Sequence, residues 1–358
     1  MDVFLKGTIT AVSPISYTTP EFGRKTKPGE AVKLPTLSGR LFIPASALRG
    51  RLRRMARDLV FEAQREKDSE FRFPLADFNL ATLGGVKSAS DKDAAEDKTE
   101  LERVSKARVS NPLASLFGAF SPVTLPGRLC VGHAITVGMV NPDTGVLAVG
   151  AVSPELVRHI RTDDLARSPE AWEMVDDDAA SEYAAQAAEA RERSGLNEEI
   201  QELDKALRAA KRAKDVAEVA SLEEKIKDAK ARRDGAKAVS LSQQLTYEVI
   251  PAGTRMESSI RLTNCSAEEV VLFFKALDRF ACNPVIGGRL NHGLGVVKGE
   301  WEVQFRESSG GSPFAAGKVS FDGDFHSLKA TGKTAEWLGA DLPWDRLDFS
   351  ADLLKKAA

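Results

Sequence analysis

Cysteine and histidine are scarce in this chain of 358 residues, which has three of the former and four of the latter. Cys130, Cys265 and Cys282 have no paired spacing, which argues against a zinc cage and suits free thiols in a reducing compartment. The histidines form neither an HxxxH nor an HExxH pattern, and no serine lies in a GxSxG motif. We therefore expect no metal site, no cofactor and no standard hydrolase centre.

Long apolar runs are also missing, since no eighteen consecutive residues are apolar. No segment is therefore predicted to cross a membrane. The N-terminal stretch MDVFLKGTITAV has no basic segment followed by an apolar one, and it is typical of a first strand rather than a signal peptide. With 42% apolar and 28% charged residues, we expect a globular cytoplasmic protein.

Acidic residues are nearly absent from residues 24–57, which contain ten Lys or Arg and a single acid, Glu30. The acids that bring the net charge to −2 lie around residues 91–102 and 174–202. A neutral total can therefore hide a positive face that suits a polyanion. The alternative interpretation of the same residues is a solvated basic helix.

The first part of the chain predicts a strand, a long loop and a helix. Residues 2–13 alternate as a strand, and residues 14–40 are rich in Pro, Gly, Thr and Lys. Ser46 is a plausible N-cap of the helix that follows. The buried face of that helix is marked by Leu48, Leu52, Met55 and Leu59. A second stripe consists of Arg49, Arg53 and Arg57, with Arg51 and Arg54 adding to the exposed side.

The last third repeats this order. TYEVIPAGTRMESSIRLTN predicts strand, turn and strand, and SAEEVVLFFKALDRFAC predicts an amphipathic helix with a capping box of Ser266 and Glu269. The strand VKGEWEVQF follows. Two strand–helix–strand halves separated by insertions predict an α+β fold with a ferredoxin-like sheet, as in RNA-recognition domains.

One insertion, residues 165–240, is rich in Ala, Glu, Lys and Arg. It contains two heptad-spaced apolar seams, Leu196–Ala210 and Val219–Ala229, which are out of phase with each other. We expect a helical hairpin that turns near Lys211–Asp215, with a single stuttered helix as the alternative. Its balanced charges favour a solvated or packing arm over a nucleic-acid arm.

GGRLNHGLGVVKG, residues 287–299, has five glycines among thirteen residues. It matches neither GxxxxGK[ST] nor GxGxxG, and it follows a helix and opens a strand, so a mononucleotide site is disfavoured. Two interpretations stay open. The glycines can serve a tight connection, or the loop can lie along a sugar–phosphate backbone through its amides and Arg289, with Asn291 and His292 as further contacts.

Four stretches resemble, in order, sequence elements of the RAMP superfamily, the repeat-associated proteins of CRISPR effector complexes. RLFIPASALRGRLRR is similar to their "IPGSSLKGxLR" element, and NPLASLFGAFSPVTLPGRLCVGHAITV to "LFG … GRLxxxDA". VIPAGTRMESSIRL resembles their "V-x-G-(T/S)-x-F" strand pair, and ALDRFACNPVIGGRLNHGLGVVKG their C-terminal glycine-rich loop. Each element alone is weak, but the ordered set is specific.

The resemblance implies a backbone subunit that coats a guide RNA through its backbone, copies of which form a helical filament with other effector subunits. Type IV complexes give the best match, and type III complexes are close. The expected division is a palm at 1–73, 128–164 and 241–305, a thumb-like insertion at 74–127, a helical insertion at 165–240 and a C-terminal extension at 306–358.

One departure from the family bears on catalysis. Type III backbones carry a metal-assisting aspartate before the "IPGSS" element, but residues 14–45 contain no Asp. We therefore expect RNA binding without catalysis. The alternative is an endoribonuclease that cuts guide precursor or target RNA through His292 or Glu30, and a third possibility is a scaffold that uses hairpin 196–235. The residues expected to line the RNA groove are Arg24, Lys25, Lys27, Ser46, Arg49, Arg53, Gly287, Gly288, Arg289, Asn291 and His292.

Overall fold

The computed structural model divides the chain into two compact units. The main unit comprises Met1–Val157 and Tyr247–Ala358, and the insert unit comprises Arg158–Thr246. The structure describes residues 1–17, 32–86, 99–121, 123–141, 143–162, 177–213, 216–235, 242–307 and 310–354. Within these ranges, no helix combines the length and the apolar character needed to cross a membrane.

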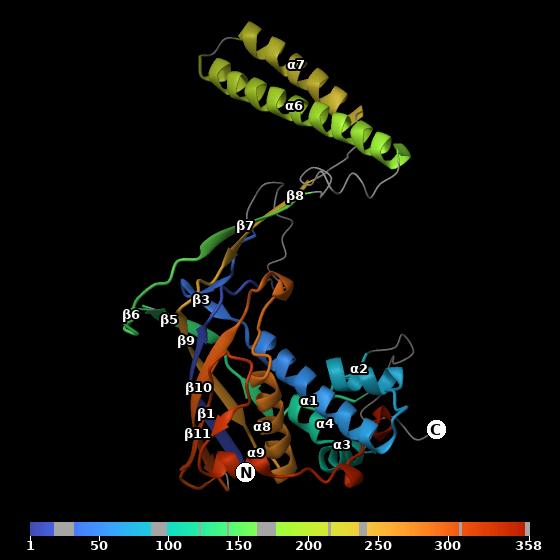
Figure 1. Ribbon diagram of the computed structural model, residues 1–358, viewed down its shortest axis with the longest axis vertical. Helices are drawn as coiled ribbons and strands as arrows, with labels where there is room; N and C mark the ends of the chain where they lie inside the picture. Colours follow the sequence, from blue (N-terminus) through green and yellow to red (C-terminus); the bar gives the residue numbers. More distant parts are fainter. Residues whose placement is uncertain are drawn as a thin grey trace. The chain divides into compact units, whose positions relative to one another are not determined.

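An antiparallel sheet forms the main unit, with its central strands in the order β10–β1–β9–β5 (Figure 1). These strands are β1 (Asp2–Ala11), β5 (Ala134–Val140), β9 (Thr254–Leu262) and β10 (Val297–Arg306). The connection between the first two of these strands along the chain contains α1 (Ala45–Lys67), and the connection between the last two contains α8 (Ala267–Ala281). This is the ferredoxin-like arrangement, so the predicted fold class is confirmed.

Further strands extend the sheet at both edges and complete its middle. They are β2 (Thr36–Leu37), β3 (Arg40–Ile43), β4 (Leu129–Val131), β6 (Leu147–Val149), β11 (Phe314–Phe321) and β12 (Lys329–Ala330). β3 pairs with β5, β4 pairs with β9, and β11 pairs with β10. The last of these pairings brings the C-terminal extension into the main sheet.

Two helices, α1 (Ala45–Lys67) and α8 (Ala267–Ala281), pack together against one face of the sheet (Figure 1). The alternation of β1 explains the core, because Leu5 and Ile9 are fully buried while Lys6 between them is exposed. The predicted apolar stripe of α1 faces this core, where Leu48, Leu52 and Met55 are buried and Leu59 is partly buried.

The two helices begin in different ways. At α8 the predicted capping box is present: Ser266 accepts from the backbone N–H of Glu269, and the Glu269 carboxylate accepts from the backbone N–H of Ser266. At α1 the predicted cap is wrong. The N-cap residue is Pro44, and Ser46 lies inside the first turn. Proline suits this position because its extended φ and ψ lead into the helix without a donor to satisfy.

Residues 74–127, which show no regular pattern in the sequence, contain the helices α2 (Leu75–Leu83), α3 (Thr99–Ser110) and α4 (Pro112–Phe117). α2 and α4 contact α1, and α4 also contacts α8. The end of the chain joins them, since Ala351 and Leu354 pack with Leu80 and Ala114 in a small second core. The helix α9 (Lys333–Gly339) packs on α8, where Trp337 stacks on Phe274.

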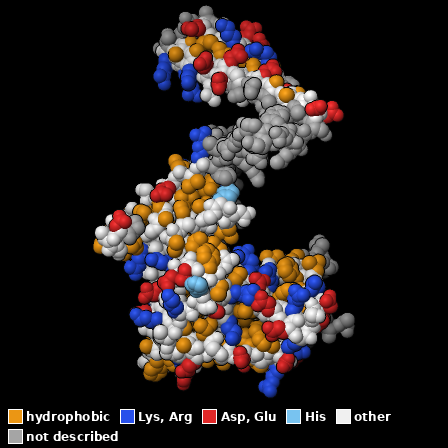
Figure 2. Space-filling model, in the orientation of Figure 1, with side chains coloured by type: hydrophobic (Ala, Val, Ile, Leu, Met, Phe, Trp, Pro, Cys, Tyr) orange, Lys and Arg blue, Asp and Glu red, His pale blue; other side chains and the backbone are white. Residues whose placement is uncertain are grey.

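The insert unit contains the helical hairpin that the heptad seams predict. α6 (Asp177–Ala213) and α7 (Val216–Gly235) pack against each other with Leu196, Ile200, Leu222 and Ile226 buried. In the chain they lie between β7 (Glu155–Thr162) and β8 (Ser242–Val249), which pair as a two-stranded sheet. Acidic and basic side chains are interspersed over the hairpin surface (Figure 2).

Candidate nucleic-acid interface

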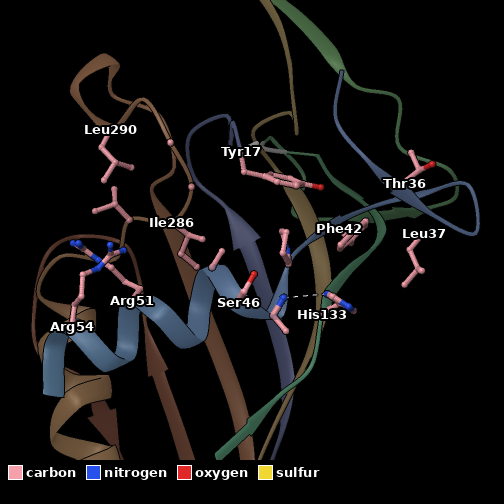
Figure 3. A pocket seen from close by; sticks show the side chains of 16 residues that line it. Tyr17, Thr36, Leu37, Phe42, Ser46, Arg51, Arg54, His133, Ile286 and Leu290 are labelled. Atoms are coloured by element: carbon pink, nitrogen blue, oxygen red, sulfur yellow. Dashed lines mark hydrogen bonds between the residues drawn. The ribbon is translucent and has the colours of Figure 1, made fainter. Parts of the chain in front are cut away.

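A groove of about 760 Å³ lies between the first turns of α1 and the glycine loop, residues 287–299 (Figure 3). Tyr17, Leu37 and Phe42 line one end and make it apolar, whereas Arg51 and Arg54 line the other end and make it basic. The remaining lining residues are Thr36, Pro44, Ala45, Ser46, Ala47, His133, Val285, Ile286, Gly287, Gly288 and Leu290. None of the described residues that line this groove carries a carboxylate, so no acidic side chain among them neutralises the two arginines.

The glycines of the loop allow it to pack on its own chain. The Gly288 N–H donates to the Ser16 carbonyl over 2.7 Å. A Cβ atom on Gly287 would lie 2.4 Å from that same oxygen, and one on Gly295 would lie 2.2 Å from the Ile286 carbonyl oxygen. Both glycines have φ near +100° or +90°, a region that other residues rarely adopt. The connection therefore requires glycine whether or not a ligand is bound.

Arg289 is held beside the groove rather than inside it. Its guanidinium stacks on the Tyr247 ring at 4.0 Å from the centroid and donates to the Ser16 hydroxyl over 3.3 Å. A guanidinium over an aromatic face is attracted by the ring quadrupole, so Arg289 fastens the loop to β8. Asn291 and His292 belong to an exposed 3₁₀ turn, Leu290–His292, and their contact with RNA stays a prediction.

Arg51 and Arg54 rise from α1 towards the glycine loop with their guanidinium groups close together (Figure 3). Arg51 is half-buried, and its Nε is buried without a hydrogen-bond partner in the described structure. Desolvation by burial and then the positive charge of Arg54 lower the Arg51 pKa. Both effects would be relieved by an anion between the two groups. Sequence spacing places these residues on the exposed side of the helix, but it does not reveal this pairing.

Arg53 is buried instead of forming part of an exposed stripe. Its guanidinium donates to the carbonyl groups of Leu80, Ala81 and Phe117 at 2.6, 2.9 and 3.3 Å. These carbonyls end α2 and α4, where helices attract a positive charge. Burial and the nearby Arg49 lower the Arg53 pKa to about 10. Arg49 also donates to the Phe117 carbonyl. Arg53 therefore holds α2 and α4 against α1, Arg49 holds α4 there as well, and neither lines the groove.

His133 caps the first turn of α1 from the other side of the groove. Its Nδ1 accepts from the Ala45 N–H over 3.1 Å (Figure 3), and its ring meets Phe42 edge-on at 5.0 Å. The ring thus replaces the side-chain cap that Ser46 was expected to supply. Of the predicted site residues, Ser46, Gly287 and Gly288 do line the groove. Arg24, Lys25 and Lys27 lie outside the described residues.

The model of the RAMP superfamily matches residues 8–298. The chain belongs to the RAMP superfamily. Three of the four elements that carry the sequence resemblance meet in the groove of this RAMP protein. "IPAS", Ile43–Ser46, begins α1, the glycine loop faces it, and His133 comes from the stretch that resembles "LFG … GRLxxxDA". A chain of the solved structure "Type IV-B CRISPR Complex" is similar at 17% identity with a TM-score of 0.40, over 95% of this RAMP chain and 100% of that chain. No curated protein matches it.

Metal ligands do not gather in the described part of this RAMP protein. Its His, Cys, Asp and Glu side chains form no group of three or more that could hold an ion. Of the three cysteines, Cys265 is buried and Cys130 and Cys282 are exposed, and none lines the groove. The chemistry available in the groove is therefore that of two arginines, one imidazole, hydroxyl groups and aromatic faces.

Proposed function

We propose that this chain binds single-stranded guide RNA along the groove and acts as a non-catalytic backbone subunit of a CRISPR effector complex. One observation carries the proposal. Arg51, whose Nε is buried and has no hydrogen-bond partner among the described residues, lies beside Arg54 in a groove whose described lining contains no carboxylate. A phosphate supplies the acceptors that both guanidinium groups lack. The apolar end, with Tyr17 and Phe42, suits the sugar or base that follows.

The glycine loop favours a strand over a single nucleotide as the ligand. Phosphate cradles need free backbone amides, but the N–H groups of Gly288, His292, Gly293 and Gly295 already donate to carbonyls of this chain. Recognition therefore depends on side-chain charge and on the open shape of the groove. Such contacts read the sugar–phosphate backbone and carry little sequence information.

The test is RNA affinity at several salt concentrations. Replacing Arg51 and Arg54 together, each by Gln, should raise the Kd for mixed-sequence RNA at least about tenfold, because a hydrogen bond to a charged group contributes about 1.5–3 kcal/mol and tenfold corresponds to about 1.4 kcal/mol. The slope of log K against log salt should fall by about 0.7 for each lost phosphate contact. The matched control replaces Arg72 and Arg346, which are exposed and outside the groove. Equal losses in both double variants would refute a phosphate site at the groove.

Catalysis is tested with the same RNA. We expect labelled repeat RNA to stay intact when it is incubated with the protein, with or without divalent metal ions. If the protein cleaves the RNA cleanly and His292→Ala abolishes the cleavage, the protein is an endoribonuclease and the non-catalytic role is wrong. The type IV assignment and the thumb at residues 74–127 remain predictions from the sequence resemblance.

A further inference from the structure

A second pocket, of about 410 Å³, lies in the main unit where β4 begins and β9 ends. Three arginines from different segments line it: Arg108 from α3, Arg128 just before β4 and Arg261 from β9. The other lining residues are Pro126, Gly127, Cys130, Thr263 and Asn264. None of the eight is acidic, and no part of the proposed groove overlaps with them.

Only part of this positive charge is compensated within the protein. Arg128 donates to the carboxylate of Glu269 over 2.8 Å, and this carboxylate is fully buried beneath the pocket. Arg108 donates to the Pro126 carbonyl and the Ser115 hydroxyl, which carry no charge. Burial and then the charge of Arg128 lower the Arg108 pKa. Of the three arginines, only Arg128 forms an ion pair with a described residue, so the pocket holds more positive charge than its described surroundings neutralise.

Arg261 is the arginine that is ready for a ligand. It is exposed, and its guanidinium forms no hydrogen bond or ion pair among the described residues. It lies opposite Cys130 in the β4–β9 pair. Its planar fork can bind two oxygens of one anion, and Arg128 and Arg108 line the same pocket from other segments of the chain. A phosphate carries several charged oxygens and can therefore accept from more than one guanidinium group of this lining.

The pocket is within reach of the groove. Cys130 lines the pocket and His133 lines the groove, and both are exposed. Because Cys130 and His133 are three positions apart in the chain, their Cα atoms are at most about 11 Å apart. We propose that the arginine pocket holds a phosphate of the same RNA strand, as a second contact beyond the groove. The inference rests on the proposed RNA-binding function and extends it.

Cys130 provides a local reporter, and Cys282 provides an internal control because it is exposed and lies outside both pockets. The full chain is treated with N-ethylmaleimide, with and without single-stranded RNA just long enough to bind one copy of the protein. Alkylation of each thiol is followed by mass spectrometry. With free RNA tenfold above its Kd, alkylation of Cys130 should slow about tenfold, as 1 + [L]/Kd. Alkylation of Cys282 should not change.

The variant Arg261→Gln links protection to the pocket. It should restore the alkylation rate of Cys130 while RNA, raised to saturation, is still bound through the groove; Arg346→Gln should keep Cys130 protected. Arg261 is exposed, so a thermal melt is expected to show an intact fold. The second contact is overturned if RNA binds the wild type without protecting Cys130, or if protection persists in Arg261→Gln. Either result leaves the proposed binding in the groove unaffected. A wild type that binds no RNA overturns the proposed function first.

Discussion

Arg53 connects three helices although it carries a charge and is only 7% exposed. Replacing it by Met keeps much of its volume but leaves the carbonyl groups of Leu80, Ala81 and Phe117 without their charged donor. We expect Arg53→Met to lower the free energy of unfolding by about 2–3 kcal/mol, the usual cost of losing hydrogen bonds from a charged group. Urea denaturation measures this value. The control, Arg54→Met at the exposed neighbouring position, should change it by less than about 0.5 kcal/mol, and equal effects would contradict the structural role of Arg53.

Sequence spacing shows which arginines share a face of α1, but not what covers that face. Arg49 and Arg53 follow the same four-residue spacing as an exposed stripe, yet Arg53 is buried under α2 and α4, and Arg49 donates to the end of α4. Those helices come from residues 74–127, where no apolar period predicts a helix. By contrast, Gly287 was expected in the groove and lines it. A glycine-rich turn that directly connects a helix to a strand is held in position by both elements.

At the scale of elements, α6 and α7 form a hairpin that buries its own apolar seam. Leu196, Ile200, Leu222 and Ile226 are covered within the pair, and the insert is a compact unit of its own. Replacing residues 177–235 by a short Gly/Ser linker should therefore leave the melting temperature of the main unit within a few degrees and its RNA affinity within about threefold. Circular dichroism melts and RNA titrations check this. Aggregation of the shortened protein would show that the hairpin stabilises the palm. A tenfold loss of RNA affinity would show that the hairpin contributes to RNA binding.

Elements with strong local signals were predictable. The seams gave the hairpin and the serine–glutamate pair gave the start of α8, because both depend on neighbours within a few residues. Elements determined by distant contacts were not. α1 starts at Pro44 with an imidazole from His133 as its acceptor, and β11 joins the sheet by pairing with β10. Neither of these long-range contacts produces a recognisable pattern in the neighbouring sequence.

At the scale of the whole molecule, the proposed function requires several copies on one RNA. Backbone contacts that ignore sequence let each copy bind the next stretch of strand. We expect mass photometry to show complexes whose copy number rises in steps as the RNA is lengthened, and monomers when RNA is absent. Raising the salt from 50 to 200 mM should dissolve the complexes, since log K falls by about 0.7 per phosphate contact for each tenfold rise in salt. If only one copy binds at every RNA length, the proposed RNA binding would stand. The proposed role as a repeating backbone subunit would then be contradicted.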